Sequence, residues 1–225
     1  MLGAFTSAAR VAEDAIAATT RLAVRFLDDV IDLTRFPLPR QQQQARLSRR
    51  IGLGITGLAD ALAMLSLRYD SAAGRELAAH LMRLIRDTAY ETSIELAAQK
   101  GAFPALDVAR YLERPFVATL PEAIITAIRS HGIRNSHLTA IAPAGTISLL
   151  AANVSSGIEP IFGIESMRRV LDTQGEYHNF QTTDFAYSIW RAEHPTASAI
   201  PDSFIAGEGV SPADQLAMVA CFRRA

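Results

Sequence analysis

The sequence predicts an α/β fold in which helices dominate and short buried strands lie between them. Over several long segments, apolar residues recur at three- and four-residue steps, which is the period of an amphipathic helix. Three short segments look instead like buried strands or closely packed backbone: glycines alternate with aliphatic residues in residues 50–60, and residues 138–142 and 157–162 are short and mostly apolar. Because helical and extended segments alternate, we expect α/β layers with mainly parallel strands.

The first half of the chain is predicted to contain two long helices. Residues 5–32 are dense in alanine and have apolar side chains at helical spacing. Pro37 and Pro39 are expected to end this helix, and the glutamine-rich segment 41–44 is expected to be a connecting loop. Residues 70–99 form the second predicted helix, since a capping residue opens the segment and leucines and isoleucines follow along one face.

The second half is predicted to alternate shorter helices with strands. Helices are expected at residues 121–130, at 181–191 and from Pro212 onward, and strands at 138–142 and 157–162.

Composition excludes several functional classes. The chain has 225 residues, of which 49% are hydrophobic and 20% charged, and its net charge of −1 gives no broad basic surface for nucleic acid or membrane. A single cysteine, Cys221, excludes an internal disulfide, a paired redox motif and a zinc site of several cysteines. No secretory signal or membrane-spanning segment is evident. We therefore expect a cytoplasmic protein that binds neither nucleic acid nor membrane.

Three glycines, Gly52, Gly54 and Gly57, have the spacing Gly-x-Gly-x-x-Gly. This spacing occurs in dinucleotide-binding loops, but such loops also require an acidic residue at the end of a second strand about twenty positions later. The sequence offers only a helical region there, so close packing of backbone against these glycines is the favoured interpretation.

Two groups of polar residues have both a functional and a structural interpretation. Asp28 and Asp32 share one helix face beside Asp29, but no histidine stands at metal-ligand spacing, so we interpret them as a solvated helix end. Residues 155–157 lack the Gly-x-Ser-x-Gly elbow of serine hydrolases. Glu159 lies in a mostly apolar strand and needs either a partner or a wet cleft, and the sequence leaves both open.

A turn between a predicted strand and a predicted helix is the most informative segment. It consists of Pro143, Ala144, Gly145, Thr146, Ile147 and Ser148. The free N–H groups at the helix start, with the hydroxyls of Thr146 and Ser148, could bind an anion, and Gly145 would let a phosphate approach the backbone. Taken alone, these residues fit an ordinary capped turn better than a phosphate site.

Four segments together resemble the large chain of adenosylcobalamin-dependent ribonucleotide reductases. They occur in the family's order, and the resemblance extends over residues 15–220. The segments are residues 25–32 (RFLDDVID), 49–60 (RRIGLGITGLAD), 135–148 (NSHLTAIAPAGTIS) and 153–162 (NVSSGIEPIF).

The resemblance implies a fold and an activity. The fold would be the ten-stranded α/β barrel of ribonucleotide reductases, with residues 1–225 as a single partial domain, truncated at both ends, that supplies roughly its second half. The parent enzyme would replace the ribose 2′-hydroxyl of a ribonucleoside diphosphate by hydrogen. It would use adenosylcobalamin to initiate radical chemistry and a thioredoxin-like protein as reductant.

The resemblance also assigns site residues. The turn 143–148 would cradle the substrate's diphosphate, which favours the phosphate interpretation over the capped turn. Ser155, Ser156, Gly157 and Glu159 would lie near the substrate cleft. Ala144 stands where the family usually has threonine. The loss of that hydroxyl predicts a diphosphate site weaker by about 1 kcal/mol unless water replaces the bond.

One departure from the family concerns catalysis itself. The chain has no Asn-x-Cys-x-Glu loop, and one thiol cannot provide both a radical and two reducing electrons. We therefore assign no catalytic residue and expect the lone chain to be inactive. The chain would be either a truncated gene product or half of a split enzyme, and in the second case a companion chain would carry the missing half. Two alternatives stay open: a non-catalytic nucleotide- or phosphate-binding module, and a helical module that binds a protein partner.

Overall fold

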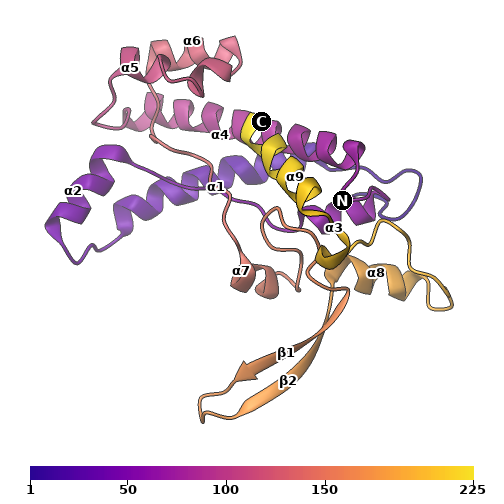
Figure 1. Cartoon of the computed structure of the whole chain (residues 1–225). Helices are drawn as coiled ribbons and strands as arrows, with labels where there is room; N and C mark the ends of the chain where they lie inside the picture. Colours follow the sequence, from indigo (N-terminus) through magenta and orange to yellow (C-terminus); the bar gives the residue numbers. More distant parts are fainter. The chain divides into compact units, whose positions relative to one another are not determined.

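The computed structural model describes residues 1–225, with the side chain of Arg224 excepted. The chain forms two compact units (Figure 1). Unit 1 comprises Met1–Ala12, Ile55–His80 and Ile141–Ala225, and unit 2 comprises Glu13–Gly54 and Leu81–Ala140. The expectation of one partial domain over residues 1–225 stays a prediction.

Unit 2 is helical and is built on a single apolar core. Its elements are α1 (Glu13–Leu33), α2 (Pro39–Ser48), the larger part of α4 (Ala72–Lys100), α5 (Val108–Leu112), the 3₁₀ turn η1 (Val117–Thr119) and α6 (Glu122–His131). Buried aliphatic residues of α1, α4 and α6, among them Val24, Leu96 and Ile128, meet in this core. Burial of each such side chain stabilises the fold by about 1.5–3 kcal/mol.

Two extended segments cross unit 2 side by side in parallel. The N–H of Leu53 donates to the Leu138 carbonyl at 2.8 Å, and the N–H of Ala140 donates to the Leu53 carbonyl at 3.0 Å. A Cβ on Gly52 would lie 3.1 Å from the Ala140 Cβ, and one on Gly54 would lie 2.9 Å from the Ala140 carbonyl oxygen. Close glycine packing is therefore confirmed at Gly52 and Gly54, whereas a Cβ on Gly57 would meet Val154 at 3.6 Å, an ordinary contact distance.

Unit 1 combines short helices with one hairpin. Its elements are α3 (Leu58–Met64), the start of α4, α7 (Gly145–Leu150), β1 (Glu165–Leu171), β2 (Tyr177–Thr183), α8 (Phe185–Glu193), the 3₁₀ turn η2 (Gly207–Gly209) and α9 (Pro212–Arg224). Its core contains an aromatic group in which Phe204 packs against Phe5, Tyr187 and Trp190, with ring centroids 5.7–5.9 Å apart. This group anchors α8 within the unit.

The hairpin of β1 and β2 was not predicted. The strands are antiparallel, with Glu165 opposite Thr183 and Leu171 opposite Tyr177. The carboxylate of Asp172 accepts from two backbone N–H groups in the connecting turn, at 2.8 and 2.9 Å. The ribbon stands apart from the helices of its own unit (Figure 1), and many of its side chains on both faces are exposed.

Several predicted helices are confirmed, and two predictions at the N-terminal end are wrong. The helices α4, α6 and α9 match their predicted segments. The first helix begins at Glu13 rather than Phe5, because the preceding residues turn back to pair Leu2 with Arg10. The predicted loop 41–44 lies inside α2, because Pro39 starts a helix well and glutamine is a good helix former.

The prediction of mainly parallel strands is wrong for the part of the chain that the structure describes. Its one sheet is the antiparallel hairpin. The predicted strands 138–142 and 157–162 form only isolated parallel bridges, Leu53 with Thr139 and Ile161 with Ala206. A strand needs a continuous hydrogen-bonded neighbour, and these segments have one over only a few residues.

Among the described residues, no helix combines the length and the apolar character needed to cross a lipid bilayer.

Candidate functional site

The turn 143–148 of unit 1 exposes the backbone of Gly145 and the side chain of Thr146. The N-cap residue of α7 is Ala144, whose methyl group cannot accept a hydrogen bond, so the first N–H groups of the helix have no side-chain acceptor there. The side chains of Pro143 and Thr146 are exposed, as is Ile147. A Cβ on Gly145 would meet nothing within 4 Å. The backbone at Gly145 can therefore be approached closely from outside the chain.

Ser148 holds the turn together from within. Its hydroxyl donates to the Gly145 carbonyl at 2.8 Å, and its N–H donates to the Ala144 carbonyl at 2.7 Å. Its own carbonyl accepts from the N–H of Val154 at 3.2 Å. Since the residue is buried, its hydroxyl positions the turn and does not face a ligand.

The segment 155–159 connects the turn to α3. Ser155 is buried, and its hydroxyl accepts from the N–H of Ala59 at 3.1 Å while its own N–H donates to a carboxylate oxygen of Asp60 at 2.6 Å. The hydroxyl of Ser156 accepts from the N–H of Ala144 at 2.9 Å. These two serines thus fix the entry of α7 relative to α3.

Gly157 has no room for a side chain. Its φ is +51°, and a Cβ there would lie 2.8 Å from the Ala142 carbonyl oxygen. The side chain of Glu159 is exposed, which answers the open question about this carboxylate in favour of a solvated position. The hydroxyl of Tyr69 donates to the Ile158 carbonyl at 2.7 Å. Burial, and then the charge of Glu159, raise the pKa of Tyr69 to about 12, so this phenol stays neutral.

The structure thus brings all ten predicted site residues together in two adjoining segments of unit 1, and it divides them into two groups. The exposed group is Pro143, Gly145, Thr146, Ile147 and Glu159, and the partly or fully buried group is Ala144, Ser148, Ser155, Ser156 and Gly157. The role of either group in substrate binding stays a prediction.

Two buried carboxylates beneath this site were missed by the sequence reasoning. Asp60 accepts from the N–H of Ser155 and, at 3.1 Å, from the N–H of Ala186. Asp184 caps α8 by accepting from the N–H of Tyr187 at 3.0 Å. Burial, and then the charge of Asp60, raise the pKa of Asp184 to about 7. Asp184 had a recognisable signal, an Asp before an apolar helical segment, whereas Asp60 had none.

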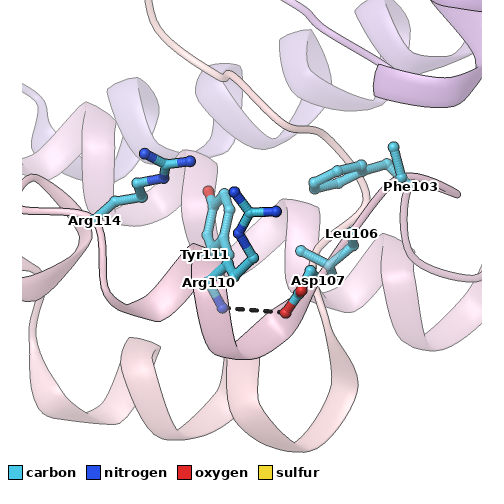
Figure 2. A pocket seen from close by; sticks show the side chains of 7 residues that line it. Phe103, Leu106, Asp107, Arg110, Tyr111 and Arg114 are labelled. Carbon is cyan, nitrogen blue, oxygen red and sulfur yellow. Dashed lines mark hydrogen bonds between the residues drawn. The ribbon is translucent and has the colours of Figure 1, made fainter.

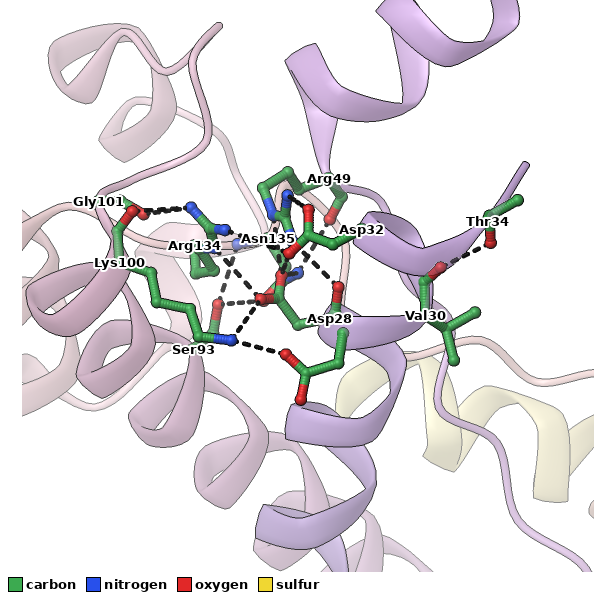
Figure 3. Close-up of polar contacts among 11 residues, drawn as sticks. Asp28, Val30, Asp32, Thr34, Arg49, Ser93, Lys100, Gly101, Arg134 and Asn135 are labelled. Carbon is green, nitrogen blue, oxygen red and sulfur yellow. Dashed lines mark hydrogen bonds and ion pairs between the residues drawn. The ribbon is translucent and has the colours of Figure 1, made fainter. Parts of the chain in front are cut away.

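A second group of polar residues lies in unit 2 and is centred on Asp28 (Figure 3). Asp28 is fully buried. One of its carboxylate oxygens accepts from Nε of Arg49 and from the side-chain amide of Asn135, both at 2.9 Å, and the other accepts from Nε of Arg134 at 3.2 Å. We call Asp28, Asp29, Asp32, Arg49, Lys100, Arg134 and Asn135 the Asp28 cluster.

The charges of the Asp28 cluster cancel, with three carboxylates against two arginines and one lysine. Arg49 donates to both carboxylate oxygens of Asp32 at 2.7 and 3.0 Å, and this bonding lowers the pKa of Asp32. Asp29 pairs with Lys100 at 2.6 Å. The interpretation as a solvated helix end is wrong for Asp28, because cations from distant segments bury it.

The three carboxylates lie close enough together to hold a metal ion, since one oxygen from each falls within 4.8 Å of the others. Each carboxylate already has a cationic partner, however. A metal ion would have to displace those cations from around a buried aspartate, so the geometry favours a structural role.

Cys221 lies in α9. Its thiol donates to the Met218 carbonyl at 3.0 Å and lies 3.8 Å from the Met218 sulfur. The thiol is thus engaged within its own helix.

Comparison with known proteins finds one family and several relatives that carry its name. The ribonucleotide reductase barrel domain family matches residues 1–199. A vitamin B12-dependent ribonucleoside-diphosphate reductase of Mycobacterium tuberculosis is 42% identical over 162 residues, which is 72% of this chain and 21% of that protein. The protein of the same name from Thermoplasma acidophilum is 38% identical over 72% of this chain and 19% of its own length.

A less similar relative is also a ribonucleoside-diphosphate reductase. A ribonucleoside-diphosphate reductase subunit alpha of Synechocystis is 34% identical over 65% of this chain and 20% of its own length. The chain therefore spans about a fifth of the length of these relatives. With most of its residues matched to the family model and the resembling segments in the same order, the chain belongs to the ribonucleotide reductase barrel domain family.

Proposed function

We propose that the chain forms part of the catalytic barrel of a ribonucleotide reductase that acts on ribonucleoside diphosphates and depends on adenosylcobalamin. Membership of the barrel domain family supports the reaction class. The names of the M. tuberculosis and T. acidophilum relatives support both the diphosphate substrate and the cofactor. Within this proposal, the turn 143–148 and the segment 155–159 bind the substrate's diphosphate.

The observation that carries the assignment is the bond from the N–H of Ala144 to the hydroxyl of Ser156. It holds the turn against the segment 155–159 while Gly145 and Thr146 remain open to solvent. Thr146 offers a hydroxyl that makes no hydrogen bond with any described residue. Open backbone N–H groups and a free hydroxyl on a fixed turn are suited to phosphate oxygens.

The thiol of this chain does not fit the radical chemistry that adenosylcobalamin would initiate. Cys221 bonds within α9, and the sequence has no Asn-x-Cys-x-Glu loop. One thiol cannot supply both a radical and two reducing electrons. The role proposed for this chain is therefore substrate binding, and the reacting thiols, like the contact to a thioredoxin-like reductant, belong to parts of the enzyme outside it.

The proposal includes a partner for the partial barrel, either a companion chain or further segments of a longer chain. A row of apolar side chains on α1 supports it, because large apolar surfaces are rarely left exposed. The row consists of Leu22, Phe26, Val30 and Leu33, spaced at three and four residues along one helix face.

Calorimetric titration with a ribonucleoside diphosphate tests the diphosphate site. We expect saturable binding that Thr146→Ala weakens, since the substitution removes the exposed hydroxyl without touching the bonds of Ser148 or Ser156. Thr173→Ala is the matched control, because Thr173 is an exposed threonine of unit 1 in the hairpin turn. Equal affinities of the folded wild type and Thr146→Ala would contradict the assignment.

The substitution Ala144→Thr should change the affinity for the ribonucleoside diphosphate in the opposite direction. A threonine hydroxyl at the N-cap position can bond to a phosphate oxygen, and we expect affinity to rise by about 1 kcal/mol, or roughly fivefold. The same titration measures it. Unchanged affinity would show that the hydroxyl missing from this position costs the site nothing.

A further inference from the structure

A pocket lies in unit 2, formed by one short stretch of chain and separate from the residues assigned to the diphosphate site. Its volume is about 220 Å³. It is lined by Phe103, Ala105, Leu106, Asp107, Arg110, Tyr111 and Arg114 (Figure 2).

One side of the pocket is apolar and aromatic. Phe103 is buried and meets the Tyr111 ring edge-on, with centroids 6.2 Å apart. Burial, and then the neighbouring phenol of Tyr90, raise the pKa of Tyr111. The phenol therefore stays neutral and adds no negative charge. With Leu106, these rings offer a wall for a small planar or apolar group.

The charged groups of the pocket are two arginines and one aspartate. Arg110 and Arg114 are four residues apart, and Figure 2 shows their guanidinium groups flanking the Tyr111 ring. The carboxylate of Asp107 accepts from the backbone N–H of Arg110 at 3.1 Å and so caps α5. Two arginines against one aspartate give the lining a net charge of +1.

In the part of the chain that the structure describes, the guanidinium groups of Arg110 and Arg114 have no carboxylate partner, unlike those of several arginines elsewhere. Arg49 and Arg134 pair with Asp28, and Arg68 pairs with Asp70 at 2.7 Å. Among the described residues, neither Arg110 nor Arg114 has an ion pair or a side-chain hydrogen bond, and both are exposed. Both forks are thus free to bind an oxyanion from solvent.

We propose that this pocket binds a small organic phosphate monoester, with the phosphoryl group between Arg110 and Arg114 and the organic group against Phe103, Leu106 and Tyr111. Arginine forks match the geometry of phosphate oxygens, and the negative charge of a phosphate monoester is complementary to the excess positive charge of the lining. The volume is below the roughly 300–1,000 Å³ of sites for drug-sized ligands, which limits the ligand to a compact molecule.

The test is an NMR-detected titration of the full chain with phenyl phosphate, and with inorganic phosphate and phenol as separate probes. We expect saturable shifts at Phe103 and Tyr111 with phenyl phosphate, weaker binding of inorganic phosphate, and none of phenol. Arg110→Gln and Arg114→Gln should each weaken phenyl phosphate binding about tenfold, as expected when a charge-assisted bidentate contact is lost. A higher salt concentration should also weaken the binding of phenyl phosphate.

Arg129→Gln is the matched control, because it removes the same charge from an exposed position on α6 of the same unit. The proposal predicts no change for this variant. Equal losses in all three variants would mean a general charge effect, and equal affinity for phenyl phosphate and inorganic phosphate would mean that the aromatic wall does not contribute. Either result, or an absence of saturable binding, would overturn the proposal. Thr146→Ala should leave this binding unchanged, which separates the pocket from the diphosphate site.

Discussion

The buried carboxylates of the two units have different kinds of partner. In unit 2, Asp28 is enclosed by cations, and bonding to Arg49 lowers the pKa of the neighbouring Asp32. In unit 1, Asp60 and Asp184 accept mainly from backbone N–H groups, and burial together with the Asp60 charge raises the pKa of Asp184 to about 7. The pKa of Asp32 is thus lowered by a cationic partner, whereas the pKa of Asp184 is raised by burial and by a neighbouring carboxylate.

The two groups of carboxylates also differ in their place in the structure: one holds helices together, and the other lies near the candidate site. The Asp28 cluster is internally neutral, its central carboxylate is fully buried, and it joins α1, the end of α2 and the end of α4. In unit 1, Asp60 accepts from the N–H of Ser155, which is next to Ser156, whose hydroxyl holds the turn 143–148. The carboxyl group whose pKa lies near neutral pH, that of Asp184, therefore belongs to the unit in which we propose that a charged substrate binds.

Removing the central charge of the Asp28 cluster should have the largest effect. Asp28→Asn leaves Arg49 and Arg134 buried without their full negative partner, and breaking a buried ion pair costs about 3–5 kcal/mol. We expect a loss of this size in the unfolding free energy, measured by urea denaturation followed by circular dichroism.

The control for that measurement is Asp29→Asn. The Asp29 side chain is half-exposed and pairs with Lys100 near the surface, where an ion pair contributes less than about 1 kcal/mol. If both substitutions cost the same, the buried position of Asp28 would not be what makes the cluster important.

The carboxylate of Asp184 should make the stability of unit 1 depend on pH. Its folded pKa of about 7 lies above the usual value near 3.8, so the folded protein binds more protons than the unfolded chain between these values. The unfolding free energy should therefore fall as pH rises from 4.5 to 8, by on the order of 3 kcal/mol. Asp184→Asn, which keeps a good capping residue, should remove this slope.

Fluorescence of Trp190, which lies in α8 of the same unit, is the appropriate probe. Glu193→Gln, an exposed acid at the end of the same helix, should leave the slope as in the wild type. A slope that survives Asp184→Asn would assign the pH dependence to other groups.

Two glycine substitutions add the same methyl group at a closely packed position, Gly54, and at an open position, Gly145. Gly54→Ala places a Cβ 2.9 Å from a backbone oxygen, and such overpacking costs about 1–3 kcal/mol. Gly145→Ala meets no atom within 4 Å and should change stability by less than about 0.5 kcal/mol. We expect Gly145→Ala to weaken ribonucleoside diphosphate binding instead, because the methyl group blocks the approach of phosphate to the backbone. Thermal unfolding and calorimetry measure the two effects.

Local signals in the sequence predicted a substantial part of this structure. The helices α4, α6 and α9 follow from apolar spacing and end signals. The order of the resembling segments predicted the family that the comparisons confirm. The hairpin was missed because most side chains of β1 and β2 are exposed, so the sequence lacks the alternation of apolar and polar residues that marks a half-buried strand.

The sequence by itself determined where most of the helices form, that Gly52 and Gly54 are closely packed, and which family the chain joins. Only the tertiary structure decided which polar residues are partners. Asn135 reaches Asp28 across 107 positions of sequence, and Ser155 reaches Asp60 across 95. Helical periodicity acts over three or four residues, whereas the state of a buried carboxylate depends on the groups that folding brings to it from distant segments.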